Sequence, residues 1–99
     1  MKIPKKLKIG GHHVTVRQVE TMQGDFSQAA GGWTESQNLI ELRKSNTASQ
    51  KEVTLIHEIL HAVNYNLTEE QVEFLSQALY QVLKDNKLYF DGKDEKWRK

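Results

Sequence analysis

Two histidines stand four residues apart within residues 54–63, and a glutamate directly follows the first, giving His57-Glu58-Ile59-Leu60-His61. On an α-helix, residues four apart project from the same side, so both imidazoles can reach one Zn²⁺ at about 2.0–2.1 Å. Glu58 is turned about 100° from His57, which places its carboxylate beside the metal. There it can take the proton of a zinc-bound water that attacks a carbonyl. The spacing predicts metal ligands at His57 and His61 and a general base at Glu58.

A catalytic zinc site usually has three protein ligands, so a further ligand is needed. No histidine follows His61, which leaves a carboxylate from the next helix: Glu69, Glu70 or Glu73. A tight antiparallel turn centred on residue 67 brings His61 level with Glu73, whereas Glu70 points away from the apolar side of its helix. We therefore expect Glu73 as the third ligand, with Glu69 as the alternative. If Glu69 binds the metal, Glu73 can orient one of the histidines.

Apolar periodicity predicts two helices that carry these residues. The first spans residues 50–66, with Ser49 and Glu52 as a capping box and Thr47 as a second candidate cap. The second opens at a capping box of Thr68 and Gln71 and runs to about residue 87. The side chains expected to be buried are Val53, Ile56, Leu60 and Val63 in the first helix and Val72, Leu75, Leu79, Val82 and Leu83 in the second.

The first part of the chain favours strands over helices. Leu7 and Ile9 alternate before Gly10-Gly11, and Val14 and Val16 alternate after it, which predicts a hairpin. Residues 21–37 are rich in glycine and small polar residues and are expected to form a loop, and residues 38–44 alternate as a third strand. The predicted fold class is α+β, with a small antiparallel three-stranded sheet packed against two helices.

Composition narrows the possible functions. The 99 residues predict a single domain over 1–99, in which residues 1–4 and 91–99 are expected to be mobile. A net charge of +1 gives no overall reason to expect nucleic acid as a partner, and basic residues near both ends are expected to be solvated. The chain has no cysteine, and no apolar run approaches the roughly 18 residues of a membrane span. We expect a cytoplasmic protein that binds neither nucleic acid nor membrane.

The segment TLIHEILHAV, followed by a helix with several glutamates, resembles the zincin metallopeptidases and, among them, the gluzincins, whose zinc ligands are His, His and Glu. The order of elements is similar to that of minimal phage- or prophage-type members related to the ImmA/IrrE-like metallopeptidases. The resemblance covers roughly residues 5–86, and the HExxH motif is its specific part. The interval from His61 to any candidate glutamate is shorter than in most gluzincins.

The resemblance implies a minimal zincin-like metallopeptidase domain and a cytosolic, zinc-dependent peptide hydrolase. The expected substrate is a peptide or protein, with a single regulatory protein as one candidate. It makes His57 and His61 metal ligands and Glu58 the general base. It also implies that the strand at residues 38–44 lies along the cleft and pairs with an extended substrate. The alternative function is a metal-stabilised module that binds a protein partner without catalysis.

Overall fold

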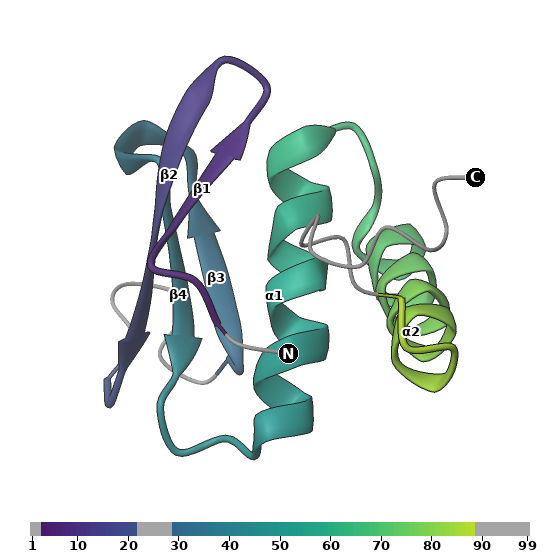
Figure 1. The fold of residues 1–99 in the computed structure, drawn as a ribbon. Helices are drawn as coiled ribbons and strands as arrows, with labels where there is room; N and C mark the ends of the chain where they lie inside the picture. Colours follow the sequence, from purple (N-terminus) through teal and green to yellow (C-terminus); the bar gives the residue numbers. More distant parts are fainter. Residues whose placement is uncertain (1–2, 22–28, 89–99) are drawn as a thin grey trace, which may run out of the picture.

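The computed structural model describes residues 3–21 and 29–88, which form a mixed sheet, one covering helix and a second helix beyond it (Figure 1). The elements in chain order are β1 (Lys6–Ile9), β2 (His12–Val19), β3 (Gly31–Thr34), the 3₁₀ helix η2 (Glu35–Gln37), β4 (Leu39–Arg43), α1 (Ala48–Val63) and α2 (Glu69–Asp85). The predicted α+β class is confirmed. The three-stranded antiparallel sheet is wrong in its details, because the sheet has four strands and is mixed.

The strand order is β1-β2-β4-β3. The predicted hairpin is present: β1 and β2 pair antiparallel, with Ile9 opposite His12, and Gly10 takes the positive φ of 59° that its tight turn requires. The strand missed by the sequence is β3, which lies within the predicted loop of residues 21–37. It forms the edge of the sheet and pairs antiparallel with β4. Strand β4 lies between β3 and β2 and runs parallel to β2.

One face of the sheet packs on α1. The buried core consists of Val14 and Val16 from β2, Ile40 and Leu42 from β4, and Leu55 from α1. Half-buried Leu7, Ile9 and Trp33 pack around it. Strand alternation accounts for this set, because every second residue of β2 and β4 faces the helix.

Both helices begin at capping boxes. Thr47 caps α1, with its hydroxyl accepting from the Gln50 N–H and the Gln50 side chain accepting from the Thr47 N–H. The helix thus begins at the second candidate cap rather than at Ser49, which lies inside it. Thr68 and Gln71 form the predicted box at the start of α2. The two helices end at residues 63 and 85, slightly earlier than predicted.

The expected buried faces of the helices are only partly correct. In α1, Ile56 is buried, but Val63 is 64% exposed, and the buried set includes two glutamates, Glu52 and Glu58. In α2, which Figure 1 shows on the side of α1 away from the sheet, the buried residues are Val72 and Ser76. Three side chains expected in its buried face are instead 41–44% exposed, namely Leu75, Leu79 and Val82. Within residues 3–21 and 29–88, the main neighbour of α2 is α1, and its buried residues form a narrow stripe.

Most of the two termini expected to be mobile, residues 1–2 and 89–99, lie outside the residues that the structure describes. Neither helix, α1 nor α2, is long and apolar enough to cross a membrane, a statement that covers residues 3–21 and 29–88.

Candidate metal centre

Helix α1 supplies two histidines to a cleft beside α2. His57 and His61 lie one turn apart, with ring centroids 4.9 Å from each other and ring planes at 63°. Their side chains are 13% and 21% exposed, so both rings are largely covered but reach solvent at one edge. Helical periodicity places them on the same side of α1, as the sequence predicted.

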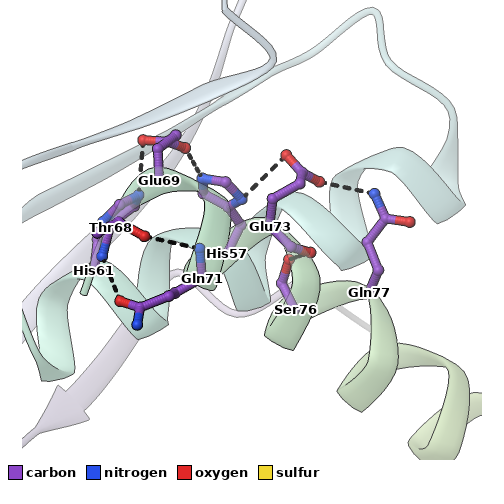
Figure 2. A network of polar contacts seen from close by, with 8 residues as sticks. All are labelled: His57, His61, Thr68, Glu69, Gln71, Glu73, Ser76 and Gln77. Atoms are coloured by element: carbon purple, nitrogen blue, oxygen red, sulfur yellow. Dashed lines mark hydrogen bonds and ion pairs between the residues drawn. The ribbon is translucent and has the colours of Figure 1, made fainter.

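The first residue of α2, Glu69, meets both histidines (Figure 2). One carboxylate oxygen, Oε1, lies 2.6 Å from His57 Nε2, and the other, Oε2, lies 3.2 Å from His61 Nε2. The short turn after α1 and the Thr68 cap bring Glu69 to this position. Burial alone would raise the pKa of Glu69, but hydrogen bonds from the histidines and their positive charge outweigh it and lower the pKa below its ordinary value.

The expected third ligand, Glu73, lies farther from the shared centre. Its Oε2 is 3.8 Å from His57 Nδ1, on the opposite edge of that imidazole from Glu69, and its Oε1 accepts a hydrogen bond of 2.7 Å from Gln77. Figure 2 shows this row of side chains, from Glu69 through His57 to Glu73 and Gln77. The geometry thus favours Glu69, the sequence-based alternative, as the residue that faces both histidines, and it gives Glu73 the orienting position.

Glu58 lies in the same cleft but is more enclosed. Its side chain is part of the buried set, at 6% exposure. Burial raises the pKa of Glu58 to about 8, and the negative charge of Glu69 contributes to the shift. A carboxyl group with a pKa near neutrality is suited to proton transfer, which is the role predicted from its position beside the histidines.

The cleft, of about 630 Å³, is bounded by β3 on one side and by α2 on the other. Its lining includes the five residues just described and Ala29, Ala30, Gly31, Gly32, Trp33, Val53, Thr54, Tyr65 and Ser76. Clefts of this size accommodate small ligands or a few residues of a peptide. Of the sequence-based candidates, Glu70 does not line this cleft; it lies in a separate hollow on α2 with Phe74.

The strand beside the cleft is β3, not β4. The sequence placed residues 38–44 along the cleft as the strand that pairs with substrate, but β4 is hydrogen-bonded to β2 on one side and β3 on the other. Both of its edges are occupied, so β4 cannot accept another strand. Gly31 explains how β3 comes so close to α1: a Cβ at this position would lie 2.6 Å from Thr54 Cγ2 and 2.9 Å from the Glu41 carbonyl oxygen.

The donor set suits zinc. His57, His61 and Glu69 can each offer one ligand atom, and these atoms lie within 4.8 Å of one another. Two imidazole nitrogens and a carboxylate oxygen are the donors found in catalytic zinc sites that keep one position open. The residues therefore fit a metal ion of this kind.

Comparisons with protein-family models, with curated proteins and with solved structures each return no match to this chain.

Proposed function

We propose that the chain is a zinc-dependent metallopeptidase that hydrolyses peptide bonds. The observation that carries the proposal is the meeting of His57, His61 and Glu69 in a cleft that also holds the enclosed carboxyl group of Glu58. A purely structural role for these residues would leave unexplained why two histidines and two glutamates line the same solvent-accessible cleft. Metal-assisted hydrolysis needs these residue types in this arrangement.

In this proposal three residues hold the metal and a fourth orients one of them. His57, His61 and Glu69 are the ligands. Glu73 faces the Nδ1 edge of His57 from 3.8 Å, longer than a direct hydrogen bond, and Gln77 holds Glu73 by donating a hydrogen bond of 2.7 Å to its other oxygen. A carboxylate on the free nitrogen of a ligand imidazole fixes the ring orientation and raises the basicity of the coordinating nitrogen.

When bound, zinc would polarise the substrate carbonyl and lower the pKa of a water molecule toward about 7. Glu58 then removes the proton of the attacking water and delivers it to the leaving amine. Its enclosure limits the access of bulk water to that carboxyl group, and a metal ion held by the three ligands would favour the ionised form that acts as the base. The remaining residues of the cleft position the peptide.

The edge strand β3 supplies the binding site for an extended substrate. Among the described residues, β3 is paired along one edge, with β4, and residues 29–33 line the cleft beside the histidines. An extended peptide added to the other edge would form main-chain hydrogen bonds regardless of its sequence, and its carbonyl groups would pass close to the candidate metal ligands. The substrate class is therefore an extended or unfolded segment of a peptide or protein.

Zinc content tests the first half of the proposal. Purified protein should contain one zinc ion per chain by elemental analysis, and the His57→Ala/His61→Ala variant should contain none. As a control, His12→Ala/His13→Ala removes two histidines from the hairpin, where both side chains are exposed, and should keep full metal content. Equal zinc in all three proteins would refute the site.

Glu58→Gln tests the catalytic half. The amide keeps the size of the side chain but cannot act as a base, so cleavage of a mixture of unstructured peptides, followed by mass spectrometry, should fall by roughly 10²–10⁴-fold with zinc content unchanged. Glu70→Gln makes the same substitution outside the cleft and should cleave normally. Zinc-loaded protein that binds these peptides without cutting them, alike in wild type and Glu58→Gln, would instead establish the metal-stabilised binding module.

A further inference from the structure

In the part of the chain that the structure describes, helix α2 buries few apolar side chains. Of its seventeen residues, Val72 and Ser76 are buried, while Leu75, Leu79 and Val82 remain 41–44% exposed. Yet α2 carries Glu69, whose carboxylate must meet two histidines of α1 within a few tenths of an ångström for metal binding. Apolar packing of this extent leaves the helix free to shift, so other contacts must hold it in place.

A polar cluster ties the other end of α2 to α1. Glu52, on α1, is 3% exposed, and its Oε1 accepts a hydrogen bond of 2.5 Å from the Tyr80 hydroxyl and one of 3.0 Å from Lys84 Nζ. Tyr80 and Lys84 are four residues apart and so lie on one side of α2. Lys84 Nζ is also 5.6 Å from the centre of the Tyr80 ring. We refer to Glu52, Tyr80 and Lys84 as the distal tie.

The distal tie and the metal centre lie at opposite ends of the same helix pair. Eleven residues separate Glu69 from Tyr80, a distance of roughly 16 Å along α2. Two attachment points that far apart fix the direction of a helix, whereas one leaves it able to pivot. Charged hydrogen bonds to an enclosed carboxylate are also stronger than exposed ion pairs, because water does not compete for the acceptor.

We propose that the distal tie positions Glu69 for metal binding, so that Tyr80 and Lys84 set the zinc affinity of a site they do not touch. The inference rests on the proposed metal centre. A ligand on a helix that is docked for only part of the time binds with an apparent affinity reduced by the docked fraction. The tie raises that fraction, and bound zinc in turn favours the tied arrangement.

The test compares zinc affinity, by competition with a chromogenic chelator, in wild type and in Tyr80→Phe/Lys84→Met. The double variant removes the two donors that α2 presents to Glu52 and should bind zinc about tenfold more weakly, a loss typical of residues that orient a ligand. Lys87→Met removes an exposed charge from the turn directly after α2 and should stay within about twofold of wild type. Tyr80→Phe alone keeps the Lys84–Glu52 contact, so its zinc affinity should lie between those of the other two variants. It keeps the test valid if the double variant misfolds.

A second background separates positioning from general destabilisation. In Glu69→Gln/Glu73→Gln, α2 supplies no carboxylate either to the metal or to His57, so adding Tyr80→Phe/Lys84→Met should change the remaining zinc affinity by less than about twofold. A tenfold loss that persists in that background would make the tie merely structural and overturn the inference. Unchanged affinity in the double variant of the wild type would do the same while leaving the metal centre intact. A wild type that binds no zinc would overturn the proposed function, and the inference with it.

Discussion

The two sides of α1 are held by different forces. Toward the sheet, Leu55 packs against buried aliphatic residues of β2 and β4, including the fully buried Ile40 and Leu42. Toward α2, the principal contacts are polar: Glu69 with the two histidines at one end, and Glu52 with its two donors at the other. The side of α1 that faces the sheet is part of a hydrophobic core. The side that faces α2 makes hydrogen bonds at both ends of a short apolar contact.

This difference separates folding from function within one helix. Apolar packing is insensitive to pH and metal, so the sheet and α1 form a platform that presents His57, Glu58 and His61 whatever the conditions. The position of α2 depends on charged groups and, in the proposed function, on zinc. Variants on the sheet side should therefore change global stability, and variants on the α2 side should change metal affinity.

The largest expected effect is on the sheet side. Leu42→Ala removes a fully buried side chain from the centre of the core and should lower the free energy of unfolding by about 3 kcal/mol. Leu79→Ala removes the same atoms from a position on α2 that is 44% exposed, and should lower it by less than about 1 kcal/mol. Urea unfolding of both variants, followed by circular dichroism, measures the two values. Comparable losses would mean that α2 belongs to the same packed core as the sheet.

The next effect concerns the metal ligands. Glu69→Gln should weaken zinc binding by about a hundredfold, because the carboxylate that faces both histidines is lost, whereas Glu73→Gln should weaken it by about tenfold through the orientation of His57. Chelator competition gives both affinities. The reverse order would return Glu73 to the ligand position that the turn geometry had suggested and would imply that α2 rotates when zinc binds.

Local signals in the sequence predicted much of this arrangement. The HExxH spacing placed the two histidines side by side on α1 because helical geometry alone determines which residues share a side. The box at Thr68 and Gln71 located the start of α2 correctly, since its hydrogen bonds form within four residues. The hairpin at Gly10 was equally local. Each of these features is decided by neighbours in the chain.

Features decided at long range were missed. Strand β3 is four residues long and begins with two glycines, so its pairing with β4 and its close approach to Thr54 gave no periodic signal, although Trp33 and Thr34 are strand-favouring residues. Which glutamate of α2 faces the two histidines depends on the angle between α1 and α2. The position of each residue along its helix does not decide it. The burial of Glu52 was also unpredicted, because its partners lie 28 and 32 residues away.

The smallest effect uses the matched pair of caps. Thr47 and Thr68 make the same two hydrogen bonds, each with a glutamine three residues later, at 2.8–3.2 Å. Replacing either threonine by alanine should destabilise its own helix by about 1 kcal/mol. Thr47→Ala acts at the start of α1, far from the ligands, so unfolding should shift to lower urea with zinc affinity unchanged.

Thr68→Ala acts on the residue directly before Glu69. Fraying of the first turn of α2 removes that carboxylate from the histidines in a fraction of molecules, so zinc affinity should fall roughly fivefold, the equivalent of about 1 kcal/mol. Global unfolding of the metal-free protein should change less than in Thr47→Ala, because α1 and the sheet remain packed. Equal losses of zinc affinity in the two variants would show that the two sides of α1 are coupled. Loss of the cap at the start of α1 would then disturb the metal site as much as loss of the cap in the first turn of α2.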